Sequence, residues 1–328
     1  GDGYVDVMVS DDARLTPGTI YINDGQGHFA HGVSVPVEAR IIADLDGDNK
    51  AELIGGDDSN LWVWPGVGDP VYPVEPILTA TPYAPSQIQV LDINQDGRMD
   101  MVSTNGEDGI FLYGQENLAF KVEKHQGLFD TYVFGDFNRD GFLDYIFEER
   151  IWVGTGEGTF IQPYSNQTNL DYRYGTPIAT GDFNGDGILD IVSAQQIFYG
   201  YGDGSFFKQG FLADMDGSIG MEVLTGDFNG DGRSDIFFST FFGFSVLFTN
   251  DGSGGFQRSL ISSGLAAKHL IQADFNNDSK PDMAMSGDGA VVVILNDYSE
   301  QDNPSAFEAS RYFRSLASSF STAKQGEA

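Results

Sequence analysis

The chain has 328 residues, and its 49 acidic residues against 17 basic ones give a net charge of −32. The aromatic content of 13% excludes an intrinsically disordered chain, and the negative charge argues against nucleic acid as a partner. Cysteine is absent, which excludes disulfides and thiolate chemistry, and the longest apolar run, Ala290–Leu295, is too short to insert into a membrane.

One acidic motif recurs along the chain. It reads D-x-[D/N]-x-D-[G/N/S]-x-x-[D/E] and is followed by alternating apolar residues. Its six complete copies begin at intervals of 44 to 48 residues, at Asp44, Asp92, Asp136, Asp182, Asp227 and Asp274. Residues 1–6 match the second half of the motif and form a seventh, truncated copy. A period of this length is typical of a repeat architecture, not of several unrelated domains.

The apolar stretches around each motif predict four short strands per unit. One strand precedes each acidic loop and another follows it, as in Asp190–Ser193. Two more flank a Gly-rich turn, as in Trp152–Gly154 before the turn and Phe160 after it. Four strands in about 46 residues are typical of propeller blades. The sequence therefore predicts an all-β, seven-bladed β-propeller with four-stranded blades, a single domain over residues 1–328, which we expect to be monomeric.

The C-terminal region carries two further predictions. Ser305–Ser318 shows the one modest helical periodicity in the chain. The stretch Ala317–Ala323 resembles the strands that precede the acidic loops, so we expect it to close the ring as the innermost strand of blade one. Deletion of residues 315–328 is then expected to destabilise the fold strongly.

The acidic residues of the motif have the spacing of calcium ligands. Calcium takes six to eight oxygen atoms, and positions 1, 3, 5, 7 and 9 of a curled loop supply them. Asx turns without a metal use the same residues, but six copies in register, with 19 of the 49 acidic residues at these positions, favour a metal. We expect about five or six structural calcium ions, with the Asp274 loop the weakest site because of Ser279 and Pro281. The predicted metal ligands are Asp44, Asp46, Asp48, Glu52, Asp92, Asn94, Asp96, Asp100, Asp136, Asn138, Asp140, Asp144, Asp182, Asn184, Asp186, Asp190, Asp227, Asn229, Asp231, Asp235, Asp274, Asn276, Asp278 and Asp282.

The loops Gly181–Asp190, GDFNGDGILD, and Gly226–Asp235, GDFNGDGRSD, resemble the FG-GAP/VCBS repeat. That repeat builds the seven-bladed propeller of integrin α chains and occurs in many secreted bacterial proteins. The resemblance covers essentially the whole chain and implies that the calcium loops join the first and second strands of each blade and serve stability. Relatives include adhesion heads, sugar-binding lectins, toxin-complex shells and polysaccharide lyases, so the resemblance does not fix a function.

A protein or glycan ligand is expected on the face opposite the calcium loops. Aromatic residues that recur in every blade are expected to be core, whereas Trp64 aligns with Gly154 and Gly200 and is therefore a candidate for ligand binding. The irregular segment Tyr164–Gly175 contains Tyr172, Arg173 and Tyr174, which suit a recognition surface. An ordinary variable loop is the alternative interpretation of this segment.

The features together favour a secreted or cell-surface binding and adhesion module. Loops of this class bind calcium at about 10⁻⁴–10⁻³ M, a concentration found outside cells. His28 and His31 could lie near each other in the first unit but have no apparent third ligand, the other two histidines lie in other units, and no catalytic constellation stands out, so we expect no enzyme. The alternatives are a propeller lectin and a polysaccharide lyase, for which Arg173 between two tyrosines is the one local indication.

Overall fold

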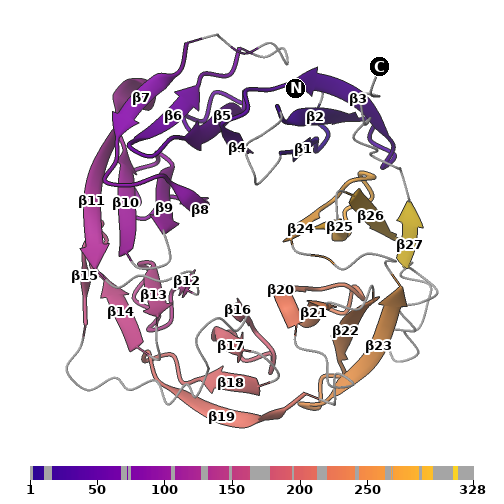
Figure 1. Cartoon of the computed structure of the whole chain (residues 1–328). Helices are drawn as coiled ribbons and strands as arrows, with labels where there is room; N and C mark the ends of the chain where they lie inside the picture. Colours follow the sequence, from indigo (N-terminus) through magenta and orange to yellow (C-terminus); the bar gives the residue numbers. More distant parts are fainter. Residues whose placement is uncertain are drawn as a thin grey trace.

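The computed structural model describes most of the chain, from residue 3 to residue 316 with gaps. The described residues are 3–10, 17–67, 72, 75–104, 108–126, 132–147, 150–162, 178–193, 196–212, 220–240, 244–262, 267, 269–287, 290–297 and 313–316. They form seven antiparallel sheets set around a central axis as the blades of a propeller (Figure 1). The predicted all-β, seven-bladed architecture is confirmed.

Each blade is a meander of strands that are consecutive in the chain. Blade one contains β1 (Val7–Val9), β2 (Thr19–Asn23) and β3 (Phe29–Ser34); blade two contains β4 (Ala39–Ala43), β5 (Glu52–Gly56), β6 (Asn60–Trp64) and β7 (Ile77–Ala80). Blade three contains β8 (Ser86–Leu91), β9 (Asp100–Thr104), β10 (Asp108–Gly114) and β11 (Phe120–Gln126); blade four contains β12 (Tyr132–Gly135), β13 (Asp144–Phe147), β14 (Arg150–Gly154) and β15 (Phe160–Ile161).

The second half of the ring repeats this order. Blade five contains β16 (Ile178–Gly181), β17 (Asp190–Ser193), β18 (Gln196–Gly200) and β19 (Phe206–Phe211). Blade six contains β20 (Gly220–Gly226), β21 (Asp235–Thr240), β22 (Phe244–Asn250) and β23 (Phe256–Ser262). Blade seven contains β24 (His269–Ala273), β25 (Asp282–Gly287), β26 (Ala290–Asn296) and β27 (Phe313–Leu316).

The structure tests only one of the two predictions for the C-terminal region. Residues 313–316 form β27, the outer strand of blade seven, so the helical expectation for Ser305–Ser318 is wrong at these positions. Antiparallel pairing with β26 outweighs a weak helical periodicity there. The predicted closing strand, residues 317–323, lies outside the described residues, and within those residues blade one has three strands.

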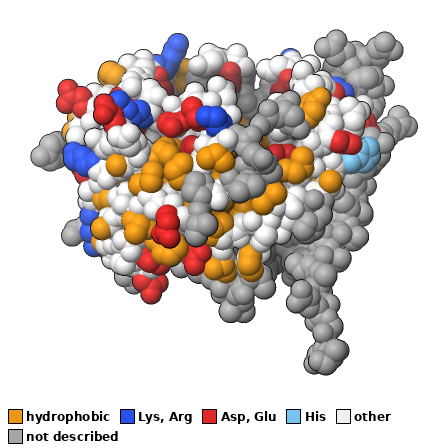
Figure 2. Space-filling model, turned by 90° about the horizontal axis from the view of Figure 1, so that it is seen from above, with side chains coloured by type: hydrophobic (Ala, Val, Ile, Leu, Met, Phe, Trp, Pro, Cys, Tyr) orange, Lys and Arg blue, Asp and Glu red, His pale blue; other side chains and the backbone are white. Residues whose placement is uncertain are grey.

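The middle strands are buried on both faces, which explains their near-continuous apolar sequences. Every residue of β21 and of β9 is buried, because a sheet in this position packs against a neighbouring blade on each side. Strands at the blade edges alternate instead: in β7 the even-numbered side chains are exposed, Leu78 at 58%. Figure 2 shows apolar side chains among acidic ones on one side of the ring.

The hydrophobic core is divided into seven clusters, and each cluster lies between two neighbouring blades. Between blades six and seven, for example, Phe228 and Phe237 pack with Met283 and Ile294. Apolar burial of this kind contributes about 25 cal/mol per Å², so the stability of each blade depends on its neighbours.

Blades one and seven close the ring through side chains that are far apart in the sequence. Val7 of blade one packs with Phe275 and Leu295 of blade seven. Phe29 meets Phe275 edge to face, with 5.8 Å between the ring centroids, and the side-chain amide of Asn23 donates to the Phe275 carbonyl at 2.8 Å. The described residues therefore already form a closed ring.

Helical structure in the described ranges consists of one 3₁₀ turn, η1 (Glu116–Leu118). None of the helices in that part of the chain is long and apolar enough to cross a membrane.

Candidate functional site

The six acidic loops occupy equivalent places in blades two to seven. Each joins the first strand of its blade to the second, as the Asp44 loop joins β4 to β5. Because every blade repeats the same strand order, the six loops lie on one face of the ring, the loop face. This placement agrees with the expectation from the FG-GAP resemblance.

The first aspartate of each loop is the centre of a network of backbone amides. One carboxylate oxygen accepts a hydrogen bond from the amide at position 6 at 2.7–3.0 Å in all six loops. In the Asp182 loop the other oxygen accepts from Gly185 at 2.7 Å and from Asp186 at 3.1 Å. The loops therefore curl around the first carboxylate, which fixes its orientation.

The residues at positions 3 and 5 form Asx turns inside the same loops. The position-3 side-chain oxygen accepts from the position-5 amide at 2.9–3.2 Å. The position-5 carboxylate accepts from the position-7 amide at 2.8–3.0 Å. Three oxygen-bearing side chains thus converge within each loop, as calcium ligation requires.

Two left-handed residues produce this curl. Position 6, predicted to turn sharply, has φ between 64° and 89° in every loop, including Asn49 and Ser279. Position 4 is left-handed as well, with φ between 56° and 78°, a feature that the sequence did not reveal. Gly47, Gly185 and Gly230 suit this conformation, but Gln95, Arg139 and Asn277 adopt it too. The Asp274 loop, predicted to be the weakest site, has the same backbone as the others.

The Asp44 loop brings three carboxylates together. Oxygen atoms of Asp44, Asp46 and Asp48 all lie within 4.8 Å of one another. Calcium–oxygen distances are about 2.3–2.6 Å, so ligands on opposite sides of one ion stand roughly 4.6–5.2 Å apart. The three carboxylates therefore fit around one calcium ion, with hard oxygen donors of the type calcium prefers.

The other five loops carry asparagine at position 3, and its amide adds a further contact. The amide nitrogen of Asn184, for example, donates to Asp186 at 2.9 Å, and the same bond recurs in the other four loops at 2.9–3.3 Å. A basic residue at position 7 approaches the position-5 carboxylate in four loops, as Arg233 approaches Asp231 at 3.0 Å. These contacts reduce the repulsion between carboxylates in the metal-free loop.

The acid at position 9 is buried and connects two parts of its blade. One carboxylate oxygen of Asp190 accepts from the Phe183 amide at 2.8 Å, and the other accepts from the Gly200 amide at 2.9 Å. The same pair of bonds recurs for Glu52, Asp100, Asp144, Asp235 and Asp282. Position 9 therefore ties the acidic loop to the turn after the third strand, a role in addition to the metal ligation that we predict for it.

Burial governs the protonation of these position-9 acids. It raises the pKa of Asp144, Asp190 and Asp282 to about 6, and that of Asp235 to about 8. The amide hydrogen bonds act in the opposite direction, and the other loop aspartates add to the rise. A cation in the loop would favour the ionised form.

The truncated loop of blade one keeps the position-9 connection. The Asp6 carboxylate accepts a hydrogen bond from the backbone amide of Asn23 at 2.9 Å, as the position-9 acids do from the equivalent backbone amides in the other blades. Gly3 is left-handed, with φ of 92°. Asp2 lies outside the described residues.

The structure corrects the interpretation of Trp64. Its side chain is 1% exposed and packs in the core between blades one and two, edge to face with Trp62. The position-9 bonds show that Gly66, not Trp64, is the counterpart of Gly154, so Trp64 corresponds to Trp152. The number of residues between the position-9 acid and the residue whose amide binds it varies among the blades, because strands two and three differ in length. Trp64 is therefore a core residue and not part of a ligand-binding surface.

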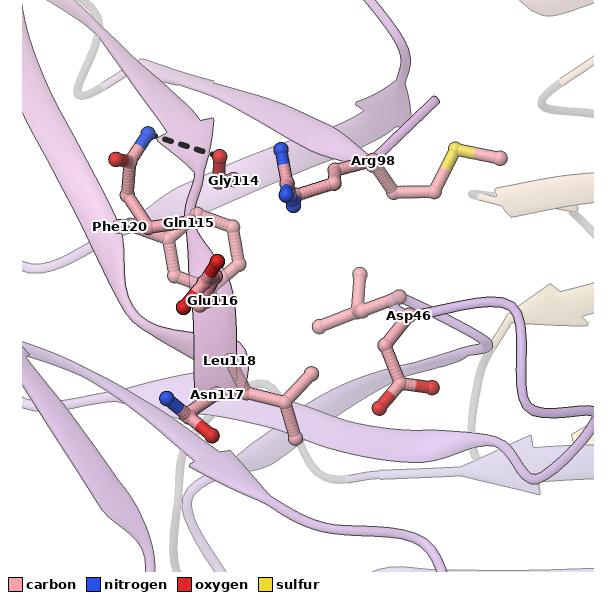
Figure 3. A pocket seen from close by; sticks show the side chains of 10 residues that line it. Asp46, Arg98, Gly114, Gln115, Glu116, Asn117, Leu118 and Phe120 are labelled. Atoms are coloured by element: carbon pink, nitrogen blue, oxygen red, sulfur yellow. Dashed lines mark hydrogen bonds between the residues drawn. The ribbon is translucent and has the colours of Figure 1, made fainter. Parts of the chain in front are cut away.

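The other predicted ligand-binding residues, Tyr172, Arg173 and Tyr174, lie outside the described residues. The structure instead shows a pocket of about 280 Å³ on the loop face, between blades two and three (Figure 3). Blade two contributes Asp46, and blade three contributes Arg98 and the η1 turn with Glu116 and Leu118.

Comparisons with known proteins agree with this architecture. Residues 44–103 and 227–285 match a family model described as an FG-GAP-like repeat. No curated protein matches the sequence.

Among solved structures, a lectin of Agrocybe aegerita, described for its recognition of non-reducing terminal N-acetylglucosamine, is 19% identical with a TM-score of 0.67, covering 90% of this chain and 87% of the lectin. A protein from Lactobacillus plantarum is 11% identical with a TM-score of 0.64, covering 89% and 91%. The Nup133 β-propeller domain of Vanderwaltozyma polyspora is 11% identical with a TM-score of 0.50, covering 95% and 91%. Such low identities support the fold alone. The chain is thus a seven-bladed β-propeller in which two segments match the FG-GAP-like repeat.

Proposed function

We propose that this propeller is a calcium-stabilised binding module that works outside the cytosol, at a cell surface or as a secreted protein, and that it holds a protein or glycan ligand without catalysing a reaction. The observation that carries the proposal is the shared geometry of the six acidic loops. In each, oxygen-bearing side chains at positions 1, 3 and 5 converge on a backbone with two left-handed residues.

Calcium would have a structural role in this module. The side chains at positions 1, 3 and 5 would hold the ion, together with the position-7 carbonyl and the remaining lone pairs at position 9. The ion would neutralise carboxylates that the fold brings together, and at tenfold excess over Kd each site would stabilise the folded state by about 1.4 kcal/mol. Six sites of this strength amount to roughly 8 kcal/mol, similar to the whole stability of many domains.

The proposed extracellular location follows from the affinity expected of such sites. Several of their carboxylates are exposed, such as Asp46 and Asp48, and position 7 carries a basic residue in four of the six loops, so weak binding is expected. Sites with Kd near 10⁻⁴–10⁻³ M are filled at extracellular calcium concentrations.

A glycan or protein ligand is supported by the fold and by the lectin among the similar structures. The face opposite the acidic loops, where the second and third strands are joined, remains the proposed site for a large partner. The segments that connect these strands in the sequence differ in length more than the acidic loops do, and variation on a rigid scaffold is typical of recognition surfaces.

A calcium titration tests the metal part of the proposal. Isothermal titration calorimetry of chelator-treated protein is expected to show about five or six sites, and the melting temperature is expected to rise at millimolar calcium. Magnesium serves as the control, because its smaller octahedral shell fits these flexible loops poorly. Absence of heat and of any shift in melting temperature at 10 mM calcium would contradict the proposal.

A glycan array, run with calcium and with chelator, tests the binding part. Calcium-dependent binding to a defined group of glycans is the expected result for a lectin, whereas a protein adhesin would bind a purified surface protein instead. Turnover of a uronic-acid polysaccharide, seen as a rise in ultraviolet absorbance, would contradict the proposal of a binding module and show that the protein is a lyase.

A further inference from the structure

We propose that the pocket between blades two and three binds a single neutral sugar ring. The inference rests on the proposed function only in that the propeller is taken to bind ligands. It concerns the loop face, whereas a large partner is proposed for the opposite face.

The pocket exists because blade three departs from a pattern shared by other blades. In blades one, four, five and six the turn after the third strand contains two left-handed glycines, such as Gly156 and Gly158. The first glycine leaves room for the position-7 side chain of the same blade: a Cβ on Gly156 would come within 2.3 Å of Phe142. The same holds for Arg233 over Gly252, at 2.5 Å.

Blade three has Glu116 at the place of that first glycine. Glu116 and the position-7 residue of this blade, Arg98, both line the pocket (Figure 3). A hollow remains between Arg98, the turn and Asp46 of blade two. Among the five blades whose turn the structure describes (one, three, four, five and six), blade three alone lacks the first glycine, and a feature of one blade is a better candidate for a specific function than a feature shared by all.

The η1 turn is also conformationally costly. Asn117 and Leu118 are both left-handed, with φ of 59° and 56°, a conformation that is unfavourable for a residue with a side chain. Leu118 nevertheless keeps it and buries its side chain between blades two and three. Strained backbone held in place by packing is often found at ligand sites.

The lining of the pocket has the chemistry of a sugar site. Leu45 and Leu118 are buried and Phe120 is half-buried, so they offer an apolar floor for the C–H face of a ring. The rim carries exposed groups that accept from and donate to hydroxyl groups, namely Asp46, Arg98, Gln115, Glu116 and Asn117. The Gln115 amide is oriented by its bond to the Gly114 carbonyl at 2.9 Å. An apolar floor with a few oriented polar groups is typical of small-molecule sites.

Size and charge narrow the ligand class. The volume of about 280 Å³ lies near the lower end of the range for small-molecule pockets, which suits one ring. Glu116 contributes a negative charge, the Arg98 guanidinium already has Asp96 at 3.5 Å, and the charge of Asp46 would be offset by the calcium ion proposed for its own loop. Anionic sugars are therefore disfavoured, and a neutral, hydroxyl-rich ring is expected.

The test uses saturation-transfer NMR and calorimetry on the whole chain in calcium buffer, with neutral hexoses, N-acetylhexosamines and glucuronic acid as probes. The wild type is expected to bind at least one neutral sugar at one site and to bind glucuronic acid more weakly. The double variant Glu116→Gly/Leu118→Gly introduces the glycine pattern of the other turns and is expected to weaken binding about tenfold or more.

Two further variants keep the test decisive. Glu116→Gln preserves the shape of the turn and is expected to weaken sugar binding. This variant tests the inference even if the double variant fails to fold. Glu157→Gln changes an exposed acid in the corresponding turn of blade four and should leave binding unchanged. The inference is overturned if the wild type binds no neutral sugar, or if the Glu116 variants bind as the wild type does. The calcium titration and the glycan array judge the proposed function separately.

Discussion

At the scale of single residues, the acidic motif contains two kinds of carboxylate with different surroundings. Positions 1, 3 and 5 form the open part of the loop, whereas position 9 is buried with both oxygens bound to backbone amides. The first group is available to a cation, and the second holds the loop to its blade in the absence of any ion. Because of these two roles, removal of the negative charge should change the free energy of unfolding differently at the two kinds of position.

A matched pair of variants in the Asp182 loop separates these roles. In chelator, Asp190→Asn is expected to lower the free energy of unfolding by about 2 kcal/mol, since an amide group cannot accept both hydrogen bonds and leaves a buried N–H without a partner. Asp186→Asn, at exposed position 5, is expected to change it by less than about 0.5 kcal/mol. Urea denaturation measures both. Equal losses for the two variants would show that position 9 has no special structural role.

Calcium should give Asp186 an importance for stability that it lacks in chelator. Asp186→Asn removes a charge from the proposed ion site and is expected to weaken calcium binding in that loop. Calorimetric titration of this variant beside the wild type should therefore show one weakened site, while the remaining sites bind as before.

At the scale of the turns, two glycines with the same φ of 76° have different surroundings. A Cβ on Gly156 would lie 2.3 Å from the Phe142 ring, whereas a Cβ on Gly187 would have no atom within 4 Å. Backbone strain is therefore equal at the two positions, and only Gly156 adds a steric conflict. The turn after the third strand therefore depends on the close approach of the Phe142 ring to the Gly156 backbone.

Alanine substitutions at the two glycines test this difference. Gly187→Ala is expected to cost about 1 kcal/mol through left-handed strain alone, and Gly156→Ala about 1–3 kcal/mol more through overpacking. In a Phe142→Ala background, Gly156→Ala should cost no more than Gly187→Ala. Urea denaturation in chelator gives all the values, and a lack of coupling between Gly156 and Phe142 would refute the packing argument.

Much of the element structure was predictable from the sequence, because the six motifs recur at a nearly fixed interval with apolar stretches between them. The acidic loops, their strands and the left-handed position 6 follow from Asp, Asn and Gly at fixed spacing. Position 4 was not predictable, since Gln95 and Arg139 give no local sign of a positive φ. The Trp64 assignment failed because the second and third strands differ in length from blade to blade. The pocket lies between residues of two blades, Asp46 and Leu45 of one and Arg98 and Glu116 of the other, so it depends on tertiary packing.

At the scale of the whole molecule, the ring has no independently folded part among its described blades. Each of the seven clusters combines residues from two neighbouring blades. The contact between blades one and seven resembles the internal contacts: Asn23 donates to Phe275 at 2.8 Å, and Asn250 donates in the same way to Phe183 at 2.7 Å. The ring should therefore unfold as one unit.

Asn23→Ala and Asn250→Ala test that expectation at the closing contact and at an internal one. Each is expected to lower the free energy of unfolding by about 1–3 kcal/mol, because a buried carbonyl loses its donor. The three tryptophans lie in blades two and four, so their fluorescence should follow the same curve as far-ultraviolet circular dichroism. Two separate unfolding transitions in Asn23→Ala alone would mean that the contact between blades one and seven is weaker than the internal contacts between blades.

The division of the core among neighbouring blades has a consequence for biosynthesis. Val7 leaves the ribosome near the beginning of translation, but its partner Leu295 is added 288 residues later. At about 5–20 residues per second this delay is roughly 15–60 s. During that time each new blade covers the previous one, while the first blade still presents its uncovered side to the cytosol or to the translocation machinery. A nascent chain of this architecture is thus exposed to pairing with its neighbours on a polysome until the final blade emerges.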